Sequence, residues 1–313
     1  MSYIIPKVLI LFGAGASYGS GGMKTPPPLG NKTLFDDLTS KSKIWHTLLD
    51  DQECIAKFDQ GFEYGMDYVL DKQFSGEFDD LYPLLKDMAS ILLNYHIQEP
   101  NDNLYWKLCQ KYFKELITNK LQFATLNYDC LLEEAIFLTN PWATISYWGD
   151  GGGIRLLKPH GSCNFISPPN VSGGGKIIPR GPGALAGPLV AMMPSGVKER
   201  LSDCPAPPGM SIYNTTKSNA IKSEQIDIIR SEFQKSIRNA ELIIVVGVYP
   251  KMEGDDHIWE NIRNAKGMVG LVDRKEYCIP WREKYRIGRD DPILEERFIT
   301  SYNGICNLID RHI

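Results

Sequence analysis

Short apolar runs alternate along this chain with longer segments of helical spacing. The runs that predict buried strands are residues 7–12, 121–125, 154–158, 242–246 and 268–272. A stretch of similar texture extends from Leu189 to Met193. Helical patterns at 224–239 and 256–265 fall between the later runs. This alternation predicts an α/β fold with a doubly wound, mostly parallel, Rossmann-like sheet.

Between the first two predicted strands the apolar residues recur at three- and four-residue spacing, as in helices. One clear stripe contains Leu81, Leu84, Leu85, Met88, Ile91, Leu92 and Tyr95. We therefore expect residues 31–118 to form a helical insertion, and residues 1–30 and 119–313 to form the sheet domain. Residues 163–220 are rich in Gly, Pro and Ser, which predicts a long irregular segment of the kind found in functional lids or disordered regions.

Three predicted strands end in short turns of small or polar residues. The glycine turn (13–17, GAGAS) follows the first strand, the asparagine turn (125–129, TLNYD) ends the second, and the histidine turn (160–162, HGS) follows the third. Ligands bind at the carboxyl edge of an open α/β sheet. Together the three turns predict a nucleotide site with chemistry attached.

The glycine turn brings backbone close to a ligand, with N–H groups free to hold a pyrophosphate. It departs from the dehydrogenase fingerprint, because Tyr18 stands where a third glycine is expected. No acid closes a following strand about twenty residues on, as that fingerprint requires. Taken alone, the turn is equally consistent with a purely structural role.

The polar side chains of the other turns each allow two interpretations. Asn127 and Asp129 either cap the next helix or act on a ligand, the amide on ribose hydroxyls or water and the carboxylate on a catalytic partner. His160 is either a structural residue or a general base near neutral pH. The other histidines form no ligand pair with it, so we expect no metal.

The last two strands end in residues of similar interest. Gly247 lets a ligand approach the end of its strand, and Asp273 stands where an adenosine ribose would be held. Asp255 and Asp256 follow Gly247 along the chain. Asp273 and the Asp255–Asp256 pair are equally interpretable as helix caps or surface charges.

Composition narrows the class of protein. The net charge of −4 gives no overall attraction to nucleic acid or to an anionic membrane, so we expect neither as a partner. A locally basic segment, 274–289, is interpreted as a solvated surface. The seven cysteines form no CxxC pair, which favours reduced, buried thiols and a cytoplasmic protein. No apolar run approaches the ~20 residues that span a bilayer.

These motifs resemble those of the sirtuin (Sir2-like) family, in the family's order. GAGAS resembles its phosphate loop, TLNYD its T-x-N-x-D motif, KPHGS its histidine element, and VVGVYP the strand end that closes its NAD pocket. The resemblance implies an NAD-binding sheet domain in which Asn127, His160 and Asp129 are catalytic. The residues it implies for NAD binding are Gly13, Ala14, Gly15, Ser17, Thr125, Gly161, Gly247 and Asp273.

The departures from the family narrow the expected activity. Sirtuin deacylases carry two CxxC pairs that bind zinc after the HGS element, and this sequence has none. Residues 25–30 and the helical insertion look more like the Sir2-like effectors of bacterial antiphage defence. That resemblance implies NAD as a substrate, hydrolysed to nicotinamide and ADP-ribose, and no zinc.

The same resemblance implies partners. It suggests a homo-oligomer with a protein partner encoded nearby, either a sensor, an ATPase such as a HerA-type protein, or an Argonaute-like protein. Two alternatives stay open: an NAD-dependent deacylase that lacks the zinc module, and a non-enzymatic regulator that binds NAD or ADP-ribose.

Overall fold

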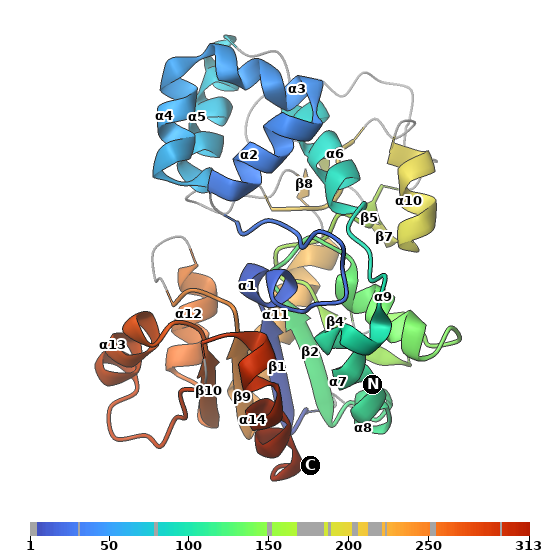
Figure 1. Cartoon of the computed structure of the whole chain (residues 1–313), viewed down its shortest axis with the longest axis vertical. Coiled ribbons are helices and arrows are strands. Elements are labelled where there is room, and N and C mark those ends of the chain that lie inside the picture. The colour runs from blue at the N-terminus through green and yellow to red at the C-terminus, as the bar shows by residue number, and fades with distance from the viewer. Residues whose placement is uncertain are drawn as a thin grey trace.

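The computed structural model describes residues 5–30, 32–77, 81–148, 152–167, 185–186, 189–201, 206–211, 221–222, 224–250, 255–294 and 296–313 (Figure 1). Its main sheet has six strands in the order β10-β9-β1-β2-β4-β3. The strands are β1 (Val8–Phe12), β2 (Leu121–Thr125), β3 (Ile145–Ser146), β4 (Ile154–Leu157), β9 (Leu242–Val246) and β10 (Met268–Val272). Every pair in this sheet is parallel, which confirms the predicted α/β class.

The sheet has a topological switch point beside β1. From β1 the chain first forms β2, β3 and β4 on one side, with β4 lying between β2 and β3, and later returns to place β9 on the other side of β1. Val8 pairs with Leu121 on one side and with Leu242 on the other, so β1, β2 and β9 run in register. All residues of these three strands are buried, as expected of strands covered on both faces. Their carboxyl ends therefore meet at one edge.

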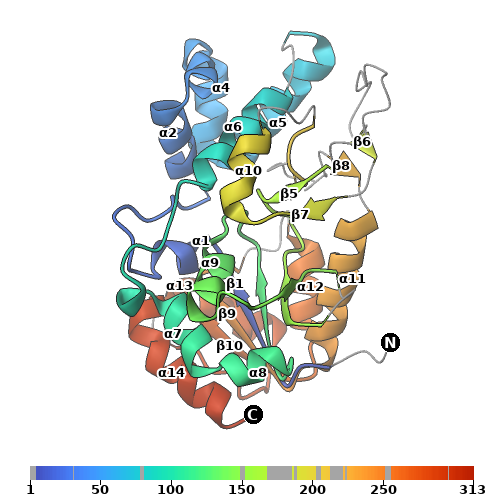
Figure 2. The same cartoon turned by 90° about the vertical axis from the view of Figure 1, so that its right-hand side faces the viewer.

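Helices cover both faces of the sheet. Helices α7 (Leu104–Lys111) and α14 (Phe298–Asp310) contact each other on one face, and α11 (Glu224–Asn239) and α12 (Asp256–Arg263) contact each other on the opposite face (Figure 2). The remaining helices around the sheet are α1 (Ala14–Tyr18), α8 (Phe113–Ile117), α9 (Leu131–Thr139) and α13 (Lys275–Tyr285). The predicted helices at 224–239 and 256–265 are confirmed, the second ending two residues earlier.

A group of helices lies beyond the carboxyl edge of the sheet in both views (Figures 1 and 2). It comprises α2 (Lys32–Lys41), α3 (Lys43–His46), η1 (Thr47–Asp50), α4 (Gln52–Gln60), α5 (Phe62–Ser75) and α6 (Leu81–Leu92). An aromatic cluster forms its core: Phe35 stacks on Phe58 at 3.9 Å between ring centroids, and Trp45 packs beside Phe62. The helical period predicted for this part of the chain is confirmed.

The predicted insertion contains two kinds of packing. Its later part, with η2 (Pro100–Asp102), α7 and α8, lies beside the sheet rather than in the helical group: α8 contacts β2 and β4, and α7 contacts α9. The division of the chain at residues 30 and 119 remains a prediction. The packing shows that the sheet recruits helices from both sides of that division.

The expected strand at 189–193 does not join the main sheet. Only Val190–Ala191 (β7) is extended, and it pairs antiparallel with β5 (Phe165–Ile166). The described parts of 163–220 also contain β6 (Leu185–Ala186) and helix α10 (Pro194–Leu201), and β6 pairs with β8 (Ile221–Lys222). Among the residues described, no helix is both long and apolar enough to cross a bilayer.

The basic segment is only partly a solvated surface. It forms α13, and the Arg286 side chain just beyond it is fully buried. Its Nε donates to Asp291 Oδ2 at 2.6 Å, and its Nη atoms donate to the carbonyl oxygens of Ala265 and Gly267. The interpretation as a surface charge is therefore wrong for Arg286. Its guanidinium is buried, pairs with the Asp291 carboxylate and donates to backbone carbonyl oxygens, so it has a structural role.

Arg286→Met is expected to lower the free energy of unfolding by about 3–5 kcal/mol, because it leaves the buried Asp291 carboxylate without its cation. Urea denaturation measures the change. Lys235→Met is the matched control, because its ion pair with Glu232 is half exposed on the lysine side and should cost at most about 1 kcal/mol. Equal losses in the two variants would contradict the structural role of Arg286.

Candidate functional site

The three polar turns meet at the carboxyl edge of the sheet, beside its switch point. The Asn127 amide nitrogen reaches across from the asparagine turn and donates to Gly13 O and to Ser17 Oγ, each at 2.9 Å. From the other side, Gly15 N donates to Gly247 O at 3.0 Å. The glycine and asparagine turns lie about a hundred residues apart in the sequence, and the parallel register of β1 and β2 brings them into direct contact.

The Ser17 hydroxyl forms hydrogen bonds with three other side chains of the site. Besides accepting the Asn127 amide, its hydroxyl donates to Asp129 Oδ2 at 3.0 Å and contacts the Tyr105 hydroxyl of α7 at 3.0 Å. All four residues are buried. A buried polar network in which each member is satisfied fixes side-chain positions more firmly than isolated hydrogen bonds. Asn127 and Asp129 are therefore held in place before any ligand arrives.

The glycine turn and Gly247 are in backbone contact. Gly247 has φ +64°, and a Cβ there would lie 2.2 Å from Ala16 N. The amides of Gly13, Gly15, Ala16 and Ser17 already donate to backbone carbonyls, two of them to Val246 O and Gly247 O. The expectation that the N–H groups of the turn are free is therefore wrong for these four: Gly13 and Gly15 donate to the end of β9 and the residue after it, and Ala16 and Ser17 donate to Gly13 O within the turn.

Asp129 carries a buried carboxyl with defined partners on both oxygens. Oδ1 accepts the Leu131 amide at the start of α9, so the helix-capping interpretation holds for this oxygen, and Oδ2 accepts the Ser17 hydroxyl. Burial raises the pKa of Asp129, while the Lys158 ammonium opposes that rise, and the hydrogen bonds oppose it further.

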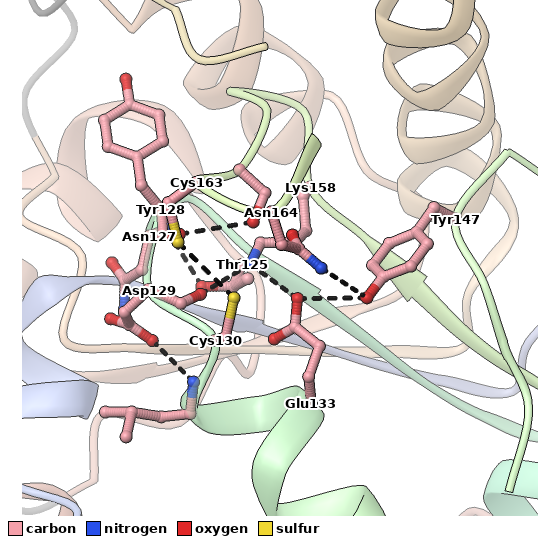
Figure 3. Close-up of polar contacts among 12 residues, drawn as sticks. Thr125, Asn127, Tyr128, Asp129, Cys130, Glu133, Tyr147, Lys158, Cys163 and Asn164 are labelled. Carbon is pink, nitrogen blue, oxygen red and sulfur yellow. Dashed lines mark hydrogen bonds and ion pairs between the residues drawn. The ribbon is translucent and has the colours of Figure 1, made fainter. Parts of the chain in front are cut away.

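A buried ion pair lies beside Asp129 (Figure 3). Lys158 Nζ is 2.9 Å from Glu133 Oε1 on α9 and donates to the Asp129 carbonyl oxygen at 2.6 Å. Tyr147 donates its hydroxyl to Glu133 Oε1, and Asn164 in turn donates to Tyr147. Burial alone would lower the pKa of Lys158. The Glu133 carboxylate opposite the ammonium, together with other nearby groups, raises this pKa above the ordinary lysine value. The lysine is therefore charged.

His160 faces an acid from the other side of the switch point. Its Nε2 lies 3.5 Å from Asp255 Oδ1, and the imidazole is almost fully buried. Asp255 stands at the N-cap of α12 but makes no capping hydrogen bond with its side chain. The interpretation as a helix cap therefore holds for the position of Asp255 and not for its side chain. At this distance the carboxylate and the imidazole form an ion pair when the ring is protonated, an arrangement that general-base catalysis can use.

The remaining predicted site residues occupy supporting positions. Thr125 Oγ1 accepts a hydrogen bond from the backbone N–H of Asn127 at 3.0 Å and so shapes the asparagine turn. Gly161 has φ +81°, and a Cβ there would collide with Gly209 O at 1.8 Å. Asp273 follows β10, where Oδ1 accepts the Arg274 amide, and burial raises the pKa of its carboxyl.

Sequence reasoning missed three residues of this region. They are Tyr105, Glu133 and the buried role of Lys158. Lys158 did leave a signal, because a lysine directly after an apolar strand has no solvated face to occupy. Tyr105 left none, because an aromatic residue in an apolar helical stripe is ordinarily a core residue, and Glu133 left none, because a glutamate on a helix ordinarily faces solvent.

The described cysteines are free and buried, as expected. Cys130 and Cys163 lie 3.5 Å apart between their sulfur atoms, in the residues that follow the asparagine and histidine turns (Figure 3). No group of three potential metal ligands occurs within the described ranges. Cys204 lies outside the described residues.

Solved structures that this chain is similar to include Sir2 proteins. One is a Sir2 bound to the inhibitor EX-527, 2′-O-acetyl-ADP-ribose and a deacetylated p53 peptide, at 15% identity with a TM-score of 0.41, covering 97% of this chain and 93% of that one. Another is a Sir2 bound to an acetylated peptide, at 14% identity with a TM-score of 0.43, covering 97% and 92%. Similarity this weak carries no conclusion about activity. No protein-family model and no curated protein sequence matches the chain.

Gly247→Ala tests the contact between β9 and the glycine turn. It is expected to lower the free energy of unfolding by more than the roughly 1–2 kcal/mol that a left-handed residue costs, because its Cβ also collides with Ala16 N. Gly288→Ala is the matched control, with φ +72° and open space around its Cβ. Urea denaturation of both variants separates collision from strain, and equal losses would remove the collision from the explanation.

Asp129→Asn tests the cost of the buried carboxylate. Because burial raises the pKa of Asp129, the folded protein holds this proton more tightly than the unfolded chain does. Relative to the variant, the wild type should lose stability as pH rises above the ordinary aspartate value towards the folded-state pKa. Denaturation between pH 3.5 and 7 measures the difference.

Asp310→Asn provides a control of opposite sign. Hydrogen bonds from Lys111 and Tyr112 lower the pKa of Asp310, so its contribution to stability is complete above the ordinary aspartate value and is lost as pH falls through the lowered pKa. Its curve is therefore followed down to about pH 2. Parallel pH curves for the two variants would contradict the raised pKa of Asp129.

Proposed function

We propose that this protein is an NAD⁺ glycohydrolase, which cleaves the nicotinamide–ribose bond to give nicotinamide and ADP-ribose. The observation that carries the proposal is the meeting of a His160–Asp255 pair with the Asn127–Ser17–Asp129 network at the switch point of a parallel sheet. Open α/β sheets bind nucleotides at that position. The resemblance of the motifs to the Sir2-like family supplies the identity of the nucleotide.

The residues fit the chemistry of this reaction. As the bond between C1′ and the nicotinamide nitrogen breaks, its electron pair leaves with nicotinamide and the ribose acquires oxocarbenium character. The carboxylates of Asp129 and Asp255 lie at the same edge of the sheet and favour that positive charge in a site of low dielectric. Water then adds to C1′ and loses a proton to His160.

Asn127 and the glycine turn supply positioning. The Asn127 amide is held by Gly13 O and Ser17 Oγ, which directs the rest of the side chain towards the ribose or the attacking water. The backbone contact between the glycine turn and Gly247 leaves small residues where the pyrophosphate approaches. Asp273, at the end of β10, is the residue proposed for the adenosine ribose.

An unregulated enzyme of this kind would deplete the NAD of its own cell. We therefore also propose a cytoplasmic antiphage effector that acts as a homo-oligomer with a partner protein encoded nearby. The sequence resemblance carries this biological assignment. Purified wild-type protein should release nicotinamide slowly alone and faster when its partner is present.

His160→Ala and Asn127→Ala are each expected to lower the rate of nicotinamide release by about 10²–10⁴-fold, the range for losing a general base or a comparable catalytic group. Asp255→Asn should lower it less, because the imidazole itself remains. His46→Ala is the matched control, since His46 is exposed on the helical group and its ring contacts the backbone carbonyl oxygen of Thr39. Chromatography of free nicotinamide measures each rate.

Adding or omitting an acetylated peptide separates hydrolysis from deacylation. Release that is independent of peptide supports the proposal, and release that requires peptide would establish a deacylase. NAD binding by calorimetry without any turnover, with or without the partner, would instead make the protein a regulator.

A further inference from the structure

Lys158 occupies a position in which a charge is costly. It follows β4 directly, its side chain is fully buried, and its pair with Glu133 is equally buried. A well-packed apolar pair of similar volume would serve the fold as well or better. The charge therefore has a role that apolar packing cannot supply.

The contacts of Lys158 join two of the three polar turns. Its backbone lies two residues before His160, and its ammonium donates to the carbonyl oxygen of Asp129 at 2.6 Å. Through the Asp129 side chain the same contact extends to Ser17 and from there to the Asn127 amide. One side chain thus fixes the turn that carries the histidine against the turn that carries the asparagine.

We propose that Lys158 is a positioning residue of the candidate site, which fixes the position of the Asp129 backbone and influences the charge of its carboxyl group. Glu133 holds the ammonium group in place. The catalytic part of this inference rests on the proposed NAD hydrolysis. The coupling between Lys158 and Asp129 does not.

Glu133 depends on Lys158 in return. Its Oε1 accepts from Lys158 at 2.9 Å and from the Tyr147 hydroxyl at 3.3 Å (Figure 3). Its Oε2 is buried and has no hydrogen-bond partner among the described residues. Loss of the lysine alone would therefore leave a buried carboxylate with a single neutral donor, so a test needs a variant that removes both charges.

The groups around Asp129 come from four elements. Lys158 faces it from the end of β4, Glu133 from α9, Tyr105 from α7 and Ser17 from α1. Lys158 is the cation among these four. Burial raises the pKa of Asp129 and the Lys158 ammonium opposes the rise, whereas the Glu133 carboxylate adds to it weakly. Removing Lys158, with or without Glu133, should raise the pKa of Asp129 further.

The experiment compares Lys158→Met with the double variant Lys158→Met/Glu133→Leu in the full chain. The double variant removes both charges and is expected to fold. Aspartate labelled with ¹³C in the carboxyl group reports the titration of Asp129, and the signal missing from Asp129→Asn identifies it. Lys111→Met is the matched control, because its ion pair with Asp310 lies on the surface.

In the double variant, we expect the Asp129 titration to move to higher pH. We also expect the kcat for nicotinamide release to fall on the order of 10²-fold at neutral pH, with little change in KM for NAD. The acid limb of the pH–rate profile should move in the same direction as the titration. Lys111→Met should change none of these quantities.

Two results would overturn the proposal. One is a folded double variant whose Asp129 titration matches the wild type, because Lys158 would then be structural only. The other is a kcat that matches the wild type at every pH. If the wild type itself releases no nicotinamide, the proposed function fails, and the carboxyl titration alone decides whether Lys158 controls Asp129.

Discussion

The in-register parallel pairing of β1 with β2 and β9 is the constraint on which the rest of the structure depends. Each of these strands is buried along its whole length, so a slip of one residue would leave the ladder misaligned with the helices on both faces. The register brings Phe12 level with Thr125 and Val246. The residues that follow these positions must therefore share one edge, and there they build the site.

At that edge, the protein buries two sets of polar side chains beside an apolar sheet. Ser17, Asn127 and Asp129 satisfy one another, while Lys158 and Glu133 form a second buried set that contacts the first through the Asp129 carbonyl. A buried charge costs desolvation energy, which a partner of opposite sign or a hydrogen bond close by offsets. The two sets therefore hold geometry and charge together, which suits a reaction with a cationic transition state.

Much of the fold could be predicted from the sequence, because its signals are local. The apolar run at 242–246 and the helix at 224–239 match the structure to the residue. A fully buried strand is recognisable from its apolar composition, and a long amphipathic helix from the spacing of its apolar residues. The short strand near 190 could not be placed, because a few apolar residues carry no information about their partner. The burial of Arg286 was missed for a similar reason. Its carboxylate partner Asp291 lies beyond the end of the helix, and its carbonyl partner Ala265 belongs to another part of the chain, so no local pattern links them to it.

The sequence by itself determined the class of sheet, the three polar turns and the residue types that the proposed ribose chemistry needs. Only the tertiary structure decided how those residues are used: that the amides of Gly13 and Gly15 donate to Val246 and Gly247, that Asp255 faces His160, and that Lys158 joins two turns. The physical reason is range. Backbone periodicity and turn chemistry act over a few residues, whereas hydrogen bonds and burial act between groups that the chain brings together only after the sheet has formed.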